Sequence, residues 1–199
     1  MIQYIQGKLV EKTPTYVVIE QGGFGWMLKV SLTSYAHIQS LESCKLWTSL
    51  VVKTENQSVA GFDLYGFFEP LERDLFEKMI SVSGVGASIA RVMLSSFKPE
   101  EIIQAIATEN EALIQSVKGI GPKSAKRIIL ELKDKVGKIG GDSVNSFAPI
   151  NNNKREEALN ALVTLGFQRA AVEKTLGKLL LTNPNKTIEE LIKDALKVL

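Results

Sequence analysis

The chain has 199 residues, of which 45% are hydrophobic, so it can fill one large core or two to three small ones. This composition excludes an intrinsically disordered tail. Its 24 Lys and Arg residues against 22 Asp and Glu residues leave a formal net charge of +2, which excludes a histone-like or strongly acidic chain. Any surface that binds nucleic acid must therefore be local.

One cysteine, Cys44, and one histidine, His37, exclude an internal disulfide framework and a closed Cys/His zinc site within the chain. We interpret Cys44 as an ordinary small residue, and His37 alone supplies no catalytic triad. No run approaches the roughly 18 apolar residues of a membrane span, and residues 1–10 lack the pattern of a signal peptide. We therefore expect a cytoplasmic protein without a metal, a cofactor or a membrane partner.

Residues 1–66 are predicted to form a small β-barrel. Five runs of alternating or β-branched and aromatic residues are separated by turns, and a short helical piece falls around 34–41. Five strands in so short a segment are typical of the Greek-key oligonucleotide-binding (OB) fold. Five basic and five acidic residues leave the segment neutral, so the barrel alone is a poor phosphate binder.

The remaining sequence predicts two helical domains joined by a flexible linker, and hence a multidomain α+β protein. Residues 67–136 follow the hydrophobic period of helices. In residues 137–153, eleven of seventeen are Gly, Ser, Asn, Asp or Pro, which is typical of a linker. Residues 154–199 are predicted to form three short helices, the last opened by a capping box of Thr187 and Glu190. Since so small a bundle has a marginal core, we expect it to dock onto a partner.

An internal repeat at an offset of 35 residues is the most informative feature of the sequence. Residues 81–91 (SVSGVGASIAR) correspond to residues 116–126 (SVKGIGPKSAK). Each copy places Gly-apolar-Gly between two helical segments, the pattern of a helix-hairpin-helix (HhH) motif. The glycines permit a tight reversal, while Val85 or Ile120 points back into the hairpin. Pro122 suits the first position of the following helix.

Each hairpin is predicted to bind DNA phosphates, because amides at a helix N-terminus beside a glycine loop attract anions. Residues 118–138 hold seven basic and two acidic residues, whereas residues 67–117 hold four basic and eight acidic ones. A charged helix face is often merely solvated, but two copies at one spacing favour DNA binding. The predicted DNA-binding residues are Gly84, Gly86, Ala87, Ser88, Arg91, Lys118, Gly119, Gly121, Lys123, Ser124 and Arg127.

Enzymatic alternatives fit the sequence less well. Residues 119–124 lack the spacing of a Walker A loop and no βαβ unit surrounds Gly84, so ATP binding is not expected. A base-excision glycosylase would place a lysine just after Gly-x-Gly and an aspartate roughly twenty residues further on, where Asp142 lies. However, Asp142 falls in the predicted linker, and catalysis requires a rigidly held group. A third alternative is a general DNA-repair scaffold.

The sequence resembles the RuvA family, the Holliday-junction-binding subunits of the bacterial branch-migration machine. The resemblance spans the chain in order: residues 23–26 (GFGW), 65–67 (YGF), the two hairpins, and 165–167 (LGF). It implies a non-catalytic homotetramer, with an octamer as the alternative, that holds open four-way junctions without sequence preference. It also implies recruitment of the hexameric ATPase RuvB, a further partner in the resolvase RuvC, and a role in recombination, repair and the SOS response.

The resemblance also assigns residues outside the hairpins. Leu162, Leu165 and Phe167 correspond to the RuvB-docking positions of a UBA-like three-helix bundle, although such residues read equally well as bundle core. Glu55 and Asn56 correspond to an acidic pin, whose carboxylates repel crossing phosphates at the junction centre. Asn56 halves the formal charge of that pin. Because Ser88 stands where a lysine is common in the family, we expect the second hairpin to contribute more phosphate binding.

Overall fold

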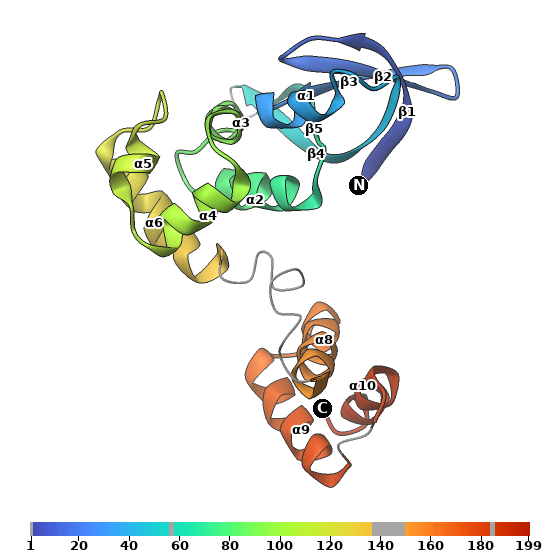
Figure 1. Ribbon diagram of the computed structural model, residues 1–199. Coiled ribbons are helices and arrows are strands. Elements are labelled where there is room, and N and C mark those ends of the chain that lie inside the picture. The colour runs from blue at the N-terminus through green and yellow to red at the C-terminus, as the bar shows by residue number, and fades with distance from the viewer. Residues whose placement is uncertain (1, 56–57, 137–149, 184–185) are drawn as a thin grey trace. The chain divides into compact units, whose positions relative to one another are not determined.

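The computed structural model describes residues 2–55, 58–136, 150–183 and 186–199. The chain divides into two compact units, Met1–Gly141 and Asp142–Leu199. The first unit holds a β-barrel followed by helices, and the second holds helices alone (Figure 1). Among the described helices, none combines the length and the apolar character that a membrane crossing demands.

The first unit begins with a closed five-stranded barrel. Its strand order is β1-β2-β3-β5-β4, and all neighbouring strands are antiparallel except β3 and β5. A short helix, α1 (Leu32–Ile38), lies between β3 and β4 in the chain. This arrangement confirms the predicted OB fold. The strands are β1 (Tyr4–Lys12), β2 (Tyr16–Gln21), β3 (Phe24–Val30), β4 (Ser43–Glu55) and β5 (Ser58–Phe67).

Five helices complete the first unit and share a hydrophobic core with the barrel. Tyr65 and Phe67 on β5 pack against Phe76, with ring centroids 4.8 and 4.9 Å apart. The predicted boundary between residues 66 and 67 therefore falls within this shared core. The helices are α2 (Pro70–Ile80), α3 (Ala87–Ser96), α4 (Pro99–Ala107), α5 (Glu111–Gln115) and α6 (Pro122–Val136).

Polar contacts also fix α3 onto the barrel. Thr33 on α1 donates a hydrogen bond from Oγ1 to the carbonyl of Leu94 at 2.6 Å. The amide of Leu32 donates to Oγ of Ser95 at 3.0 Å. Because α3 is the second helix of the first hairpin, these bonds hold that hairpin in a set orientation on the barrel.

The second unit is a three-helix bundle of α8 (Ile150–Thr164), α9 (Arg169–Thr182) and α10 (Ile188–Leu196). The predicted capping box is present, since Thr187 and Glu190 exchange side-chain-to-amide hydrogen bonds at the start of α10. Helix α8 begins at Ile150, inside the predicted linker. The three asparagines that follow have a low intrinsic helix propensity, which is why the sequence indicated a linker there. The remainder of that linker, residues 137–149, lies outside the described residues.

Candidate nucleic-acid interface

The two hairpin loops have the same conformation. Gly84 and Gly119, 35 residues apart, adopt φ angles of +88° and +96°. In each loop the residue after the glycine donates a backbone hydrogen bond to the carbonyl three residues earlier: Val85 to Val82 at 3.0 Å, and Ile120 to Val117 at 3.1 Å. The repeat in the sequence is therefore a repeat in three dimensions, which confirms the predicted pair of hairpins.

The two glycines of each loop serve different purposes. Gly84 and Gly119 need the left-handed φ that glycine adopts without a steric penalty. Gly86 has an ordinary φ of −83°, and a Cβ added at Gly86 or Gly121 would meet no atom of the described chain within 4 Å. Gly86 is the N-cap of α3, a position that serine or asparagine would fill as well as glycine does, so the fold itself does not require the absence of a side chain there. Its missing side chain leaves the backbone open to a group that approaches from outside.

Each loop leads directly into the N-terminus of a helix. Helix α3 has Gly86 as its N-cap and makes no side-chain capping bond. Helix α6 begins at Pro122, whose missing amide would have had no partner within the helix. First-turn amides of a helix lack intrahelical acceptors, and together with the helix dipole they favour an anion. Both loops thus present backbone donors suited to a phosphate.

The fold brings the two hairpins side by side. Arg127 on α6 donates from Nη1 to the carbonyl of Ser83 in the first loop, at 3.3 Å. A Cβ added at Gly119 would lie 3.9 Å from Cγ1 of Ile89 on α3. All four loop glycines are exposed, as are Ser88, Lys118, Lys123 and Arg127, whereas Ala87, Arg91 and Ser124 are half-buried. The eleven predicted residues therefore lie on two adjacent loops and the helices that follow them.

The cations of these hairpins differ in their contacts. Lys118 and Lys123 make no ion pair within the described parts of the chain. Arg127 has its Nε 3.5 Å from a Glu131 carboxylate oxygen. Arg91 donates from Nη1 to the carbonyl of Thr15, in the turn between β1 and β2, at 3.0 Å. Arg91 therefore braces α3 against the barrel, a contact that sequence spacing did not predict.

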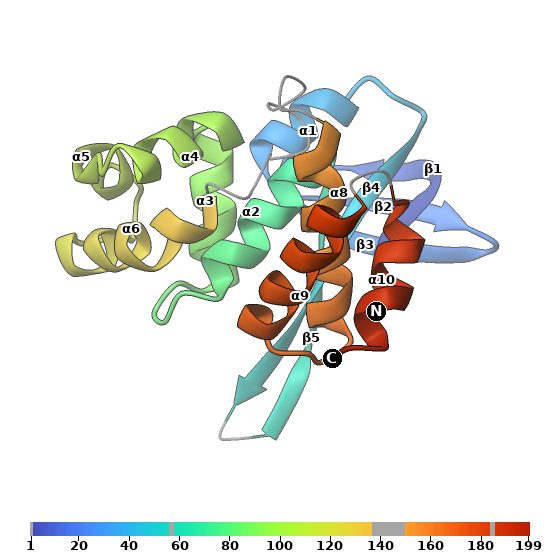
Figure 2. The same ribbon diagram turned by 90° about the horizontal axis from the view of Figure 1, so that it is seen from below.

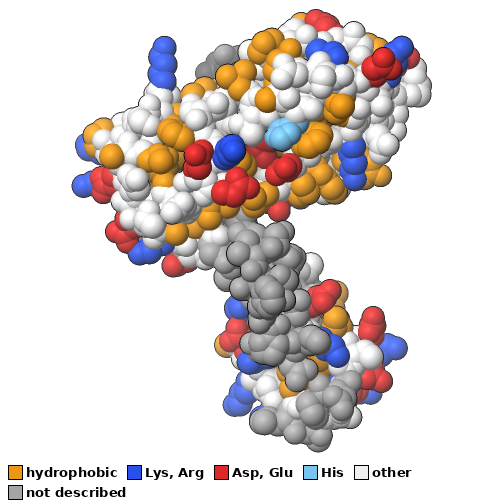
Figure 3. Space-filling model, viewed as in Figure 1, with side chains coloured by type: hydrophobic (Ala, Val, Ile, Leu, Met, Phe, Trp, Pro, Cys, Tyr) orange, Lys and Arg blue, Asp and Glu red, His pale blue; other side chains and the backbone are white. Residues whose placement is uncertain are grey.

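Acidic side chains lie elsewhere on the first unit. The segment around α2 carries Glu69, Asp74 and Glu77 outside the core, while Glu72 is buried, and Figure 3 shows acidic groups gathered near the single histidine on one face. DNA phosphates would be repelled there. This charge distribution favours the hairpins as the place where a polyanion binds.

The hairpin of β4 and β5 extends beyond the rest of the barrel (Figure 2). Strand β1 pairs with β4 only up to Trp47, and β3 pairs with β5 only at Tyr65 and Gly66, while β4 and β5 continue together to Glu55 and Ser58. Of the predicted acidic pin, Asn56 lies outside the described residues, and Glu55 is the last residue of β4. Apolar side chains on this arm are exposed at Leu50, Val52, Val59 and Phe62.

The predicted docking residues of the second unit do not share one environment. Leu162 is fully buried in the bundle core, in agreement with its interpretation as a core residue, and in this conformation it offers no surface to a partner. Phe167 is half-buried and packs against that core. Leu165 is 61% exposed, just before Gly166 with its φ of +100°. Leu165 is the one of the three that offers a large apolar surface.

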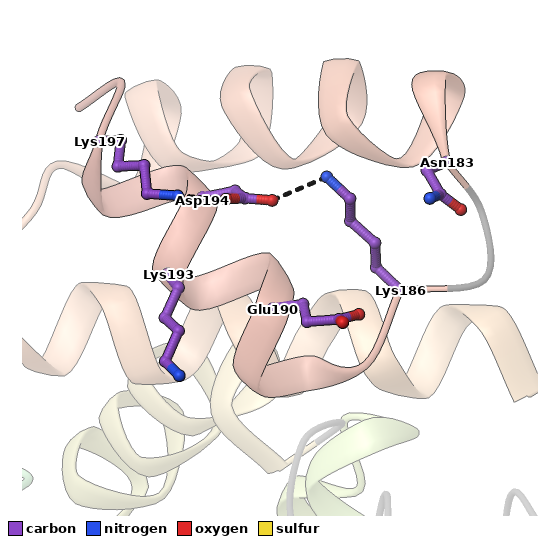
Figure 4. Close-up of a pocket in the computed structure, with 6 residues that line it drawn as sticks. All are labelled: Asn183, Lys186, Glu190, Lys193, Asp194 and Lys197. Atoms are coloured by element: carbon purple, nitrogen blue, oxygen red, sulfur yellow. Dashed lines mark hydrogen bonds and ion pairs between the residues drawn. The ribbon is translucent and has the colours of Figure 1, made fainter.

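A shallow pocket on α10 was not predicted from the sequence (Figure 4). Lys186 and Lys197 donate to the Asp194 carboxylate at 2.8 and 3.0 Å. These bonds lower the pKa of Asp194 to about 2. The positive charges of Lys186 and Lys197 are therefore already paired with a carboxylate of the same bundle. The described residues contain no cluster of His, Cys, Asp and Glu suited to a metal ion.

A closed OB barrel continued by two adjacent helix-hairpin-helix motifs defines the class of the protein as DNA-binding. Comparison with known families agrees with this class. Residues 1–66 match the RuvA N-terminal domain, residues 76–134 the SAM-like helix-hairpin-helix tandem, and residues 153–199 the RuvA C-terminal domain. The chain belongs to the RuvA family.

Similar proteins cover the chain from end to end. One from Christiangramia forsetii is 48% identical over 199 residues, with 100% of both chains covered. Others from Flavobacterium psychrophilum and Cytophaga hutchinsonii are 47% and 45% identical, with 99% and 100% of both chains covered. Each of these relatives is named as a Holliday junction branch migration complex subunit, RuvA.

Proposed function

We propose that this chain binds four-way (Holliday) DNA junctions and holds them open for branch migration by a separate ATPase motor. The observation that carries the proposal is the pair of adjacent glycine loops, each of which opens a helix N-terminus toward solvent. The relatives that match the chain from end to end are named for the same function, which supports the proposal.

Binding is independent of DNA sequence in this proposal. The loops offer backbone amides, and the exposed Lys118 and Lys123 lie beside them. Such groups contact phosphates, which position a protein on DNA but carry no base information. Selectivity for a junction then comes from its shape, because several chains engage several arms at once.

We propose a homotetramer, in which each chain serves one arm, with an octamer as the alternative assembly. The arm of β4 and β5 supports self-association, since an isolated two-stranded hairpin with exposed apolar residues such as Phe62 is marginally stable in water. The turn of this arm is the proposed acidic pin. One carboxylate there, from Glu55, would repel phosphates at the junction centre.

The second unit is proposed to recruit the hexameric ATPase RuvB through Leu165 and Phe167, and RuvC is a further proposed partner. The chain itself is proposed to be non-catalytic and cytoplasmic, with no cofactor. The glycosylase alternative would depend on Asp142, which lies outside the described residues.

Competition binding tests the proposal. Full-length protein is titrated with a synthetic four-way junction and with linear duplex of the same arm sequences, and the mass of the complex is measured. We expect strong preference for the junction and a mass of four or eight chains. Equal affinity for both DNAs would favour the repair scaffold. Release of a base from lesion-containing duplex would favour the glycosylase.

A further inference from the structure

The two copies of the hairpin repeat have the same backbone but unequal charge. Two loop positions that carry Lys118 and Lys123 in the second copy carry Ser83 and Ser88 in the first. The one cation of the first copy, Arg91, is bonded to the carbonyl of Thr15 on the barrel. The first loop thus offers the amides of a phosphate site without a cation of its own.

Arg127 brings a cation to that loop from the other hairpin. Its guanidinium donates to the carbonyl of Ser83 at 3.3 Å, across 44 residues of sequence. The repeat-related position in the first copy is Val92, so the bond has no counterpart in the other direction. The bond therefore brings a cation to the one loop that has serines in place of the two lysines.

The guanidinium remains able to bind a further acceptor. Arginine has five N–H donors, and the bond to Ser83 uses one of them. The Glu131 carboxylate is 3.5 Å from Nε, and both side chains of this pair are partly exposed, so the pair is weak. Since Arg127 is 54% exposed, its remaining N–H groups can reach a phosphate that sits on the first loop.

We propose that the first hairpin holds its phosphate in a composite site, whose amides come from its own loop and α3 and whose cation is Arg127 of α6. This inference rests on the proposed DNA binding and assigns Arg127 to the first hairpin. Lys118 and Lys123 serve the second. Each hairpin then neutralises a phosphate, although one of them lacks lysine.

The test uses the full-length protein, a synthetic four-way junction and the dependence of log affinity on log salt concentration. Arg127→Gln and Lys123→Gln should each flatten the slope by about 0.9 for every phosphate that is no longer neutralised, which is roughly eightfold weaker binding per phosphate at 0.1 M salt. Lys135→Gln is the matched control, because Lys135 is exposed on the same helix but far along it from the loops. It should leave the slope near that of the wild type.

A lysine added to the first loop distinguishes the two hairpins. Ser88→Lys supplies the cation that the first loop lacks, so it should restore the slope and affinity of Arg127→Gln to within about twofold of the wild type. In the Lys123→Gln background, Ser88→Lys should increase the slope and the affinity only by as much as it does in the wild type. This difference in rescue would support the composite site.

Equal rescue of both variants, or rescue of neither, would overturn the composite site. Unfolding midpoints close to that of the wild type establish that the variants are folded, and Arg127→Lys should retain most of the slope because it keeps the charge. If the wild type itself shows no preference for the junction, the proposed function fails. If Lys123→Gln flattens the slope and Arg127→Gln does not, only the assignment of Arg127 fails.

Discussion

Glu72 on α2 accepts a hydrogen bond from the hydroxyl of Ser34 on α1, 2.5 Å between Oε2 and Oγ, in the interior of the first unit. The other carboxylate oxygen accepts from Ser31, the N-cap of α1. Ser34 in turn accepts from the amide of Phe68 at 2.8 Å. A single buried carboxylate therefore joins the barrel, the segment that leaves it and the first hairpin helix.

Replacing Glu72 should change how stability depends on pH. Burial raises the pKa of Glu72 above its ordinary 4.5, against the opposing effect of the two serine hydroxyls. Because the folded-state pKa is raised, the protonated Glu72 side chain stabilises the fold fully below about pH 4.5. This stabilisation is lost as the pH rises through the folded-state pKa. Relative to Glu72→Gln, the wild type should therefore lose unfolding free energy as the pH rises above about 4.5.

Urea unfolding followed by tryptophan fluorescence measures this difference, because Trp26 and Trp47 both lie in the barrel. Glu42→Gln is the control, since Glu42 is an exposed carboxylate of the same unit that does not act on Glu72, and it should follow the wild type. If the unfolding free energy of the wild type instead increases with pH relative to that of Glu72→Gln, the raised pKa of Glu72 is contradicted.

The two glycines of the first loop should separate stability from DNA binding. Gly84→Ala should lower the unfolding free energy by about 1–2 kcal/mol, because its φ of +88° is strained for alanine. Gly86→Ser should leave stability within about 0.5 kcal/mol, since the φ of residue 86 is ordinary, the added Cβ meets nothing and serine is at least as good an N-cap as glycine. Junction binding by Gly86→Ser should nevertheless weaken by about tenfold or more, as a charge-assisted bond is worth about 1.5–3 kcal/mol.

Thermal or urea unfolding and junction titration of the same two preparations provide the measurements. Unchanged binding by Gly86→Ser would show that no phosphate approaches this backbone. Loss of stability in that variant would show that the glycine has an internal role after all.

Sequence reasoning succeeded where a local pattern determines the structure. Alternating residues predicted the five strands, and Gly-x-Gly at a fixed offset predicted two loops in which Gly84 and Gly119 have positive φ. The capping box of Thr187 and Glu190 also depends on residues three apart. Each of these features is set by neighbours along the chain.

The long-range bonds that assemble the site were not predictable in this way. Arg91 meets Thr15 across 76 residues, and Arg127 meets Ser83 across 44. Such pairs leave no periodic trace in a single sequence. Leu162 shows the converse case, because its helical spacing indicated the core correctly while the family resemblance indicated a docking position.

Cys44 should be almost unreactive in the folded chain. Its side chain is buried in the barrel, and burial raises the pKa of its thiol to about 11. Since only the thiolate reacts, reaction with a disulfide reagent at pH 8 should be slower than that of a free thiol by roughly a hundredfold or more. Denatured protein should react rapidly with one equivalent, and rapid reaction of folded protein would contradict this burial.

Removal of residues 142–199 should separate DNA binding from coupling to the motor. The first unit keeps its own core and both hairpins, so junction affinity should stay within about twofold of the full chain. ATP-driven branch migration with the RuvB motor should be abolished. Migration that survives the deletion would remove the docking role from the second unit.

A point variant locates that role on the surface of the bundle. Leu165→Asp should leave the bundle folded, because the Leu165 side chain is 61% exposed, and it should abolish motor-driven migration while junction binding stays intact. Leu196→Asp is the matched control, since Leu196 is also an exposed leucine, but on α10. Migration should persist in that variant. Equal loss in both would mean that the bundle tolerates no surface carboxylate, whereas equal activity in both would exclude Leu165 as the docking residue.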